Sequence, residues 1–235
     1  MGLNVVIRGE TEHPQSVVVV LHGSGQNAGD MAQAADIFSR EIPGALILIP
    51  DGPKPLPGCN GFDWFTPEFT GSPQQLAFNL QPALAGLDEL IDSQLKKHAL
   101  TDGNLALFGF SLGGMTAMYE GLHRPSPCAV VICHSSIYPQ QIEPNSKPPV
   151  VMVMGKKNIE GIEADIRDGK SPASFSYPLS VSRLQEQEIP VAEYLLPGLT
   201  HMMTAESLEK SARIVNGGLN GGQEIRAALL PVRQP

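Results

Sequence analysis

Six short apolar runs recur along this chain, and they constrain its fold more than any other feature. Each is five or six residues long and nearly continuous in apolar character: residues 17–21, 45–49, 104–108, 129–133, 150–154 and 191–196. Runs of this length without polar alternation are typical of parallel strands that are covered on both faces. We therefore expect these segments to lie side by side in one sheet.

Helical patterns separate the runs. The clearest places five aliphatic residues on one face of a helix, at spacings of three and four: Leu80, Leu84, Leu87, Ile91 and Leu95. Pro82 is expected in the first turn of this helix, where its missing N–H costs no hydrogen bond. The alternation predicts an α/β fold with a doubly wound, mostly parallel sheet and helices on both faces. Residues 4–8 are expected to add an antiparallel edge strand.

Composition supports a single domain. Of the 235 residues, 42% are hydrophobic and 17% are charged, which is enough apolar material for one sizeable core. We expect one domain over residues 1–216 and a glycine-rich tail over 217–235. Residues 51–73 form a long connection rich in Gly and Pro, with aromatic residues at Phe62, Trp64, Phe65 and Phe69. A loop of that length in a compact domain is often functional.

Net charge and the start of the chain narrow the function classes. The formal charge of −8 gives no footprint for nucleic acid or an anionic membrane surface. No stretch approaches the roughly 18 uninterrupted apolar residues of a membrane span, and the start lacks the pattern of a signal peptide. Val6 stands where a myristoylation motif needs Ser or Thr. The sequence predicts a soluble cytoplasmic protein with no nucleic-acid partner and no stable membrane anchor.

The cysteines point to no special chemistry. Cys59, Cys128 and Cys133 form neither an even disulfide set nor the spacing of metal ligands. Cys128 and Cys133 fall on one predicted strand, too far apart to bridge. We therefore expect reduced thiols and no metal site.

Ser111 is the candidate nucleophile. The segment Gly109-Phe110-Ser111-Leu112-Gly113 matches G-x-S-x-G, a pattern that is weak on its own. Here it follows the predicted strand 104–108 and precedes residues 114–119, which can continue as a helix. This is the strand–turn–helix context in which such a serine is presented for attack, and the helix N-terminus stabilises negative charge beside it.

Acyl transfer also needs N–H donors aimed at the oxyanion. The backbone N–H of Leu112, directly after the nucleophile, is the first candidate. The loop after the strand at 17–21 should supply the second, and Ser24 of the glycine-rich segment that follows it fits this place. We expect the Leu112 and Ser24 amides to form the oxyanion hole.

Four segments occur in an order that resembles a known family, and the resemblance spans about residues 16–215. They are LHGSG at 21–25, PDGP at 50–53 with Trp64 beyond it, GFSLGG at 109–114 and PGLTH at 197–201. As a set they resemble the acyl-protein thioesterase and carboxylesterase (phospholipase/carboxylesterase) family of the α/β-hydrolases. The resemblance implies a hydrolase of carboxylic esters or thioesters that uses no metal and no organic cofactor.

The resemblance also implies residue roles. His201 matches the family's catalytic base, which takes the serine proton and returns it to the leaving group. His22 matches a structural histidine of the oxyanion loop, and Trp64 matches an aromatic segment beside the acyl pocket. From the sequence alone, His134 closes a predicted strand and is expected to be a satisfied core residue.

The acid of the triad is where the chain departs from the family pattern, which is roughly G-x-x-D-x-x-x-P. Read directly from Gly155, the pattern places Asn158 where the aspartate belongs. Counted backward from His201, it places Asp168 there, with Pro172 four residues later and about ten extra residues before it. We predict Asp168 as the acid; Asn158 and Asp165 remain alternatives, as do the longer side chains of Glu160 and Glu163.

The leading interpretation is an esterase or thioesterase that forms an acyl-enzyme on Ser111 with a small-molecule or acylated substrate. Two alternatives remain. An acyltransferase would pass the same acyl group to an alcohol or amine, and a non-catalytic binding protein would keep the hydrolase fold without the triad acid. The oligomeric state, including a homodimer, is left open.

Overall fold

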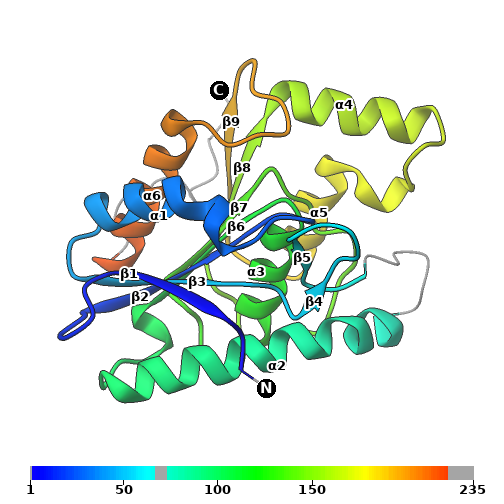
Figure 1. Ribbon diagram of the computed structural model, residues 1–235. Coiled ribbons are helices and arrows are strands. Elements are labelled where there is room, and N and C mark those ends of the chain that lie inside the picture. The colour runs from blue at the N-terminus through cyan, green and yellow to red at the C-terminus, as the bar shows by residue number, and fades with distance from the viewer. Residues whose placement is uncertain (1, 67–72, 222–235) are drawn as a thin grey trace.

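The computed structural model describes residues 2–66 and 73–221, and it is built on one seven-stranded sheet (Figure 1). The strand order is β1-β3-β2-β6-β7-β8-β9, and only β1 runs antiparallel to its neighbour. The strands are β1 Val5–Gly9, β2 Ser16–Leu21, β3 Ala45–Pro50, β6 Leu105–Phe110, β7 Val130–His134, β8 Val150–Gly155 and β9 Val191–Leu196. The predicted mostly parallel sheet is confirmed, and β1 is the antiparallel edge strand.

Helices cover the sheet on both faces. They are α1 Ala32–Glu41, α2 Pro73–Lys97, α3 Leu112–His123, α4 Lys156–Arg167, α5 Tyr177–Glu186 and α6 Ala205–Leu219. Val17, Val19 and Leu21 of β2 belong to the buried cluster that includes residues of α2, α3 and α5, whereas Val18 and Val20 belong to the cluster that includes residues of α1 and α6. Because successive strand residues point to opposite faces, a strand between two helix layers has to be apolar throughout.

The helix predicted around Leu80 is longer than expected. α2 has 25 residues, and Pro82 lies in its interior rather than in its first turn. A proline there removes one backbone hydrogen bond and disfavours the helix. The burial of Leu80, Leu87 and Ile91 against the sheet offsets this cost.

Two segments contain more regular secondary structure than the sequence predicted. The connection after β3 carries a two-stranded ladder, β4 Lys54–Pro55 with β5 Phe62–Asp63, and Phe62 also bridges to Gln26. Phe69 lies outside the described residues. At the other end, α6 continues to Leu219, so the domain boundary predicted at residue 216 falls inside a helix. Of the predicted tail, residues 222–235 lie outside the described part of the chain.

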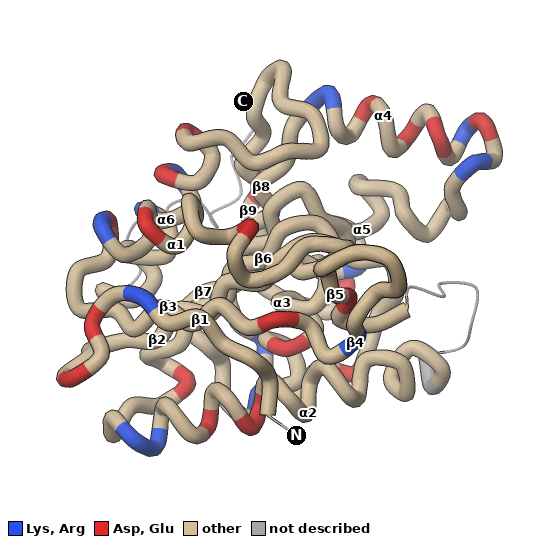
Figure 2. Tube along the Cα trace, viewed as in Figure 1, with Lys and Arg blue, Asp and Glu red and all other residues tan. Residues whose placement is uncertain are grey.

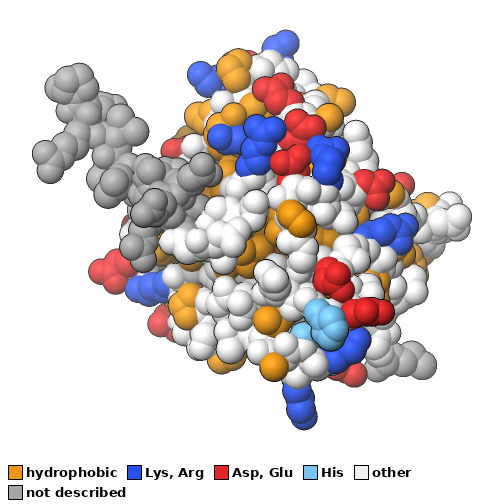
Figure 3. All heavy atoms as spheres, turned by 90° about the vertical axis from the view of Figure 1, so that its left-hand side faces the viewer, with side chains coloured by type: hydrophobic (Ala, Val, Ile, Leu, Met, Phe, Trp, Pro, Cys, Tyr) orange, Lys and Arg blue, Asp and Glu red, His pale blue; other side chains and the backbone are white. Residues whose placement is uncertain are grey.

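Charged residues of both signs lie along the same helices. Figure 2 shows acidic and basic residues along both α2 and α4, and Figure 3 shows side chains of both signs interspersed on one face of the molecule. Cys59 is exposed, Cys128 and Cys133 are buried, and all three are free. Within residues 2–66 and 73–221, no helix combines the length and the apolar character needed to cross a bilayer.

Candidate active site

Ser111 lies on a strained turn between β6 and α3. Its φ of 55° and ψ of −119° form a conformation that side-chain-bearing residues rarely adopt. The flanking glycines make this turn sterically feasible. A Cβ on Gly109 would lie 2.1 Å from the Gly113 carbonyl oxygen, and one on Gly113 would lie 2.3 Å from the His22 carbonyl oxygen. The G-x-S-x-G spacing therefore has a direct steric cause.

His201 lies beside Ser111, although it follows the edge strand β9 and Ser111 follows the interior strand β6. It lies in the loop between β9 and α6, and its Nε2 is 2.9 Å from Ser111 Oγ. The ring packs against Phe110, with 5.2 Å between ring centroids. Burial lowers the pKa of His201 below its ordinary value, which favours the neutral imidazole that a general base requires.

Asn158 occupies the other side of the imidazole. Its Nδ2 lies 3.2 Å from His201 Nδ1 and 3.1 Å from Met154 Sδ, and the residue is 7% exposed. A thioether sulfur only accepts, so the amide NH₂ is directed at both neighbours. An N–H donated to Nδ1 leaves the imidazole proton on Nε2, facing Ser111. This arrangement favours the tautomer opposite to the one that deprotonates a serine.

The structure does not bring Asp168 to His201, which corrects the predicted position of the acid. Asp168 is the C-cap of α4, its side chain is 49% exposed, and its Oδ2 lies 3.0 Å from Lys170 Nζ. The segment counted as an insertion is a helix that projects from the end of β8 (Figure 1). Ten helical residues place about 15 Å between Asn158 and Asp168.

Two of the three other acidic alternatives, Asp165 and Glu163, are engaged elsewhere. Asp165 lies 3.8 Å from Lys170 Nζ, and Glu163 accepts a hydrogen bond from the Tyr177 N–H at 3.0 Å. Among the described residues, no carboxylate hydrogen-bonds to His201. The direct reading of the family pattern from Gly155 therefore identifies the residue beside His201, and that residue is an amide.

The loop predicted to form the oxyanion hole is held by a side chain that no sequence pattern indicated. Asp63 Oδ1 accepts hydrogen bonds from Ser24 Oγ at 2.6 Å and from the Gly25 N–H at 3.2 Å. Gln26 Oε1 accepts from the Gly23 N–H at 2.9 Å. Within the described residues, the Ser24 and Leu112 amides donate to no protein acceptor. Both remain available for a ligand oxygen, as an oxyanion hole requires.

His22 and Trp64 tie this loop to the rest of the fold. His22 Nδ1 lies 2.8 Å from the Gly23 carbonyl oxygen, and His22 Nε2 accepts from the Gly52 N–H at 3.0 Å. Trp64 Nε1 donates to the His22 carbonyl oxygen at 2.9 Å, and the two rings are 4.9 Å apart. Burial lowers the pKa of His22, which agrees with a neutral ring held between backbone groups.

Trp64 is 1% exposed, yet it borders a hollow of about 370 Å³ together with Phe65, Phe78 and Pro82. Its indole N–H is already committed to the oxyanion loop, so only its ring face is available to an apolar group. The predicted substrate contact at Trp64 is therefore restricted to van der Waals packing.

His134 is a core residue. It is fully buried, with Nε2 at 2.9 Å from Ser207 Oγ and Nδ1 at 3.2 Å from Ser135 Oγ. Burial lowers its pKa to about 4. Within the described part of the chain, no group of three or more His, Cys, Asp or Glu side chains is arranged to hold a metal ion.

A doubly wound sheet with a strained serine at a strand-to-helix turn defines the chain as an α/β-hydrolase. The model of the Phospholipase/Carboxylesterase family matches residues 2–156, and the protein belongs to that family. Family and site together support a hydrolase of the esterase type.

Solved structures share the fold at low sequence identity. The structure titled esterase PE8 is 22% identical, with a TM-score of 0.74 over 92% of this chain and 98% of its own. Arabidopsis thaliana SOBER1 is 19% identical, with a TM-score of 0.69 over 87% of this chain and 99% of its own. The Bacillus cereus carboxylesterase is 19% identical, with a TM-score of 0.66 over 92% of this chain and 94% of its own.

Proposed function

We propose that the protein hydrolyses carboxylic esters or thioesters through an acyl-enzyme on Ser111. The observation that carries the proposal is the 2.9 Å separation between Ser111 Oγ and His201 Nε2, with Ser111 presented on the strained turn. Membership of the Phospholipase/Carboxylesterase family supports the same reaction class.

The reaction begins when His201 Nε2 takes the Ser111 proton and Oγ attacks the acyl carbonyl carbon. The Ser24 and Leu112 amides bind the resulting oxyanion, and His201 returns the proton to the leaving alcohol or thiol. Water, activated by the same imidazole, then releases the acid. The bond to Ser111 is thus formed and broken within one cycle.

Asn158 sets a condition on this mechanism. Nε2 can accept a proton only when the imidazole hydrogen is on Nδ1, and that hydrogen needs an acceptor. Rotation of the Asn158 amide by 180° would direct Oδ1 at Nδ1, at the expense of the contact with Met154 Sδ. A neutral amide stabilises imidazolium less than a carboxylate does. We expect slow turnover relative to a complete triad.

We propose that the acyl part of the substrate packs in the hollow beside Trp64, because the Trp64 indole is hydrogen-bonded to His22 at the start of the loop that carries Ser24. The hollow's volume of about 370 Å³ and its aromatic border suit a short alkyl or aryl acyl group. A series of p-nitrophenyl esters and acyl thioesters of increasing chain length would measure this preference. Comparison of kcat/KM for esters and thioesters of the same acyl group decides between the two substrate classes.

Fluorophosphonate labelling tests the proposal directly. Intact-mass measurement should show one adduct on the folded protein and none on Ser111→Ala. Peptide mapping should place the adduct on Ser111, and ester turnover should disappear in both Ser111→Ala and His201→Ala. A folded protein that stays unlabelled would contradict the proposal.

Asn158 favours one alternative, a non-catalytic protein that binds acyl compounds through the same fold. In that case product binding would be measurable while turnover stayed at the level of Ser111→Ala. Ester turnover that depends on both Ser111 and His201 removes this alternative.

A further inference from the structure

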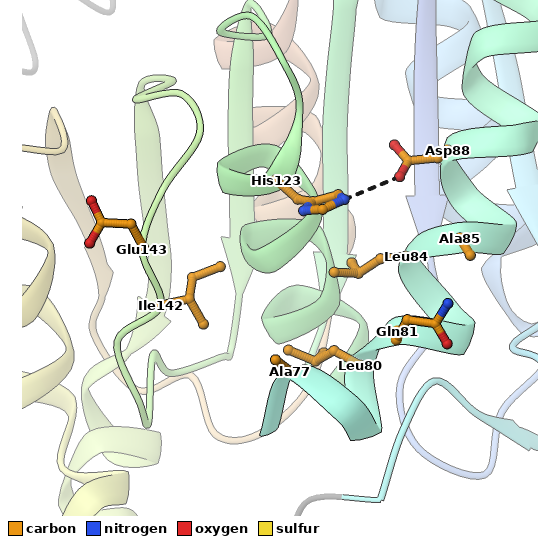
Figure 4. Close-up of a pocket in the computed structure, with 9 residues that line it drawn as sticks. All are labelled: Ala77, Leu80, Gln81, Leu84, Ala85, Asp88, His123, Ile142 and Glu143. Atoms are coloured by element: carbon orange, nitrogen blue, oxygen red, sulfur yellow. Dashed lines mark ion pairs between the residues drawn. The ribbon is translucent and has the colours of Figure 1, made fainter. Parts of the chain in front are cut away.

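A second cavity lies at the opposite end of α3 from Ser111. It has a volume of about 550 Å³ and is lined by α2, by the C-terminal end of α3 and by residues 142–143 (Figure 4). α3 has 12 residues, so its ends are about 18 Å apart at 1.5 Å per residue. The cavity is therefore separate from the Ser111–His201 pair, and its size is typical of small-molecule sites.

The body of this cavity is aliphatic. Ala77, Leu80, Leu84 and Ala85 line it from α2, with Gln81 as the polar residue among them, and Ile142 lines it from the other side. Figure 4 shows Leu80, Leu84 and Ile142 around the middle of the space, with Glu143 directed away. A ligand held here has to present an apolar body, because polar groups at the middle would lose water without gaining a partner.

One end of the cavity is polar. His123 Nε2 lies 3.4 Å from Asp88 Oδ2, and both side chains are partly exposed. The other oxygen of Asp88 accepts from Arg124 Nη1 at 2.7 Å, which fixes the orientation of the carboxylate. Asp88 and His123 both line the cavity, and a stronger donor can replace the long contact between them.

This end also carries an excess of negative charge. The Arg124 side chain is 4% exposed and is paired with Asp88, Asp92 and Asp102. Behind Asp88 lies the fully buried side chain of Glu120, and burial raises the pKa of that carboxyl well above its ordinary value. With Glu120 protonated, three carboxylates face one guanidinium. A cation is the charge that complements this surplus.

We propose that this cavity binds a small organic monocation, with its ammonium group on Asp88 Oδ2 and its alkyl or aryl body between Leu80, Leu84 and Ile142. The site is independent of ester hydrolysis at Ser111. It takes amines that carry a hydrophobic substituent and discriminates against neutral and anionic compounds of the same shape.

Calorimetric titration of the full-length Ser111→Ala protein tests the charge requirement without turnover. The probes are 4-phenylbutylamine, 4-phenyl-1-butanol and 4-phenylbutyrate, which share one body. The amine should bind about tenfold more tightly than the alcohol: both can donate to Asp88 Oδ2, but only the ammonium adds the attraction between opposite charges. The carboxylate should show no binding. Equal affinity for amine and alcohol, or no binding of the amine, would overturn the proposal.

Paired variants test the location. Ala85→Trp fills the cavity from an exposed position of α2 and should abolish amine binding, whereas Ser93→Trp, exposed on the same helix outside the cavity, should preserve it. If Ala85→Trp does not fold by circular dichroism, Ala77→Trp fills the same space. Asp88→Asn should weaken binding about tenfold and Glu89→Gln, with the same charge change, should not. Equal effects within either pair would overturn the assignment.

Discussion

The amide nitrogen of Asn158 lies 3.2 Å from His201 Nδ1, on the side of the imidazole that faces away from Ser111. In a Ser-His-acid triad this position accepts a hydrogen bond, whereas here it donates one. The chain therefore places a neutral amide beside the proposed nucleophile and base.

Asn158→Asp should raise kcat/KM for an activated ester by at least about tenfold. A carboxylate would accept from Nδ1–H and stabilise imidazolium, and the reverse change in a serine protease costs on the order of 10⁴ in turnover. The carboxylate should also raise the pKa of His201 and move the acid limb of the pH profile upward. Asn158→Ala is the control, and equal activity in both variants would contradict this account.

The acid limb of kcat/KM in the unmodified protein should lie below pH 6.5. Burial lowers the pKa of His201 from its ordinary value of 6.5, so the neutral base persists as the pH falls. A pH profile measured with a neutral ester checks this. An acid limb above pH 6.5 would indicate a charge partner that the described residues do not provide.

Stability should fall between about pH 6.5 and pH 4 because of His134. The pKa of this buried side chain is lowered to about 4, so in this range the unfolded chain binds a proton that the folded chain does not. The free energy of unfolding above pH 6.5 should exceed that at pH 4 by on the order of 3 kcal/mol from this residue. This difference is lost progressively as the pH falls through that range.

Urea unfolding at pH 7.5 and pH 5 measures this loss. His134→Asn should show a smaller pH dependence than the unmodified protein. The matched control is His13→Asn, at an exposed position, which should leave the dependence unchanged. An identical slope in all three proteins would assign the effect to other groups.

Asp63→Ala should lower kcat about tenfold with little change in KM. Removal of the carboxylate frees the Ser24 hydroxyl and the Gly25 N–H, and a displaced oxyanion amide affects the transition state more than the bound ester. Asp63→Asn retains an acceptor oxygen and should recover most of the loss. If Asn and Ala behave alike, Asp63 does not position the loop.

Gly109→Ala should destabilise the protein by more than about 2 kcal/mol and abolish fluorophosphonate labelling. The added Cβ would lie 2.1 Å from the Gly113 carbonyl oxygen, in backbone that cannot move without displacing Ser111. Gly161→Ala is the matched control, since it lies in the interior of α4 and no atom of the described residues is within 4 Å of its added Cβ. Thermal melts should show Gly161→Ala to be neutral or stabilising by about 0.5–1 kcal/mol.

Local sequence patterns predicted the sheet well because the strands between helix layers are buried on both faces. The run at residues 17–21 is apolar throughout for this reason, and β2 in the structure differs from it by one residue. The extent of α2 was not predictable in the same way. Its interior Pro82 is tolerated only because of packing against distant strands, which a local pattern does not contain.

The triad acid was misplaced because the count from His201 assumed a loop that returns to the site. The segment is α4, and it carries Asp168 away from His201. The residues Ile159, Ile162 and Ile166 recur at helical spacing and would have indicated this helix. Asp63 was missed for another reason, because its partners Ser24 and Gly25 are about forty residues away and no periodic pattern connects them.

Ser111 follows an interior strand, whereas its partner His201, 90 residues later, follows β9 at the edge of the sheet. An edge strand has neighbours on one side only and can detach at lower free energy than the sheet interior. Detachment of β9 would separate the base from the nucleophile while the rest of the sheet stayed folded. The proposed reactivity of Ser111 toward a fluorophosphonate should therefore be lost on heating before the circular dichroism of the sheet changes.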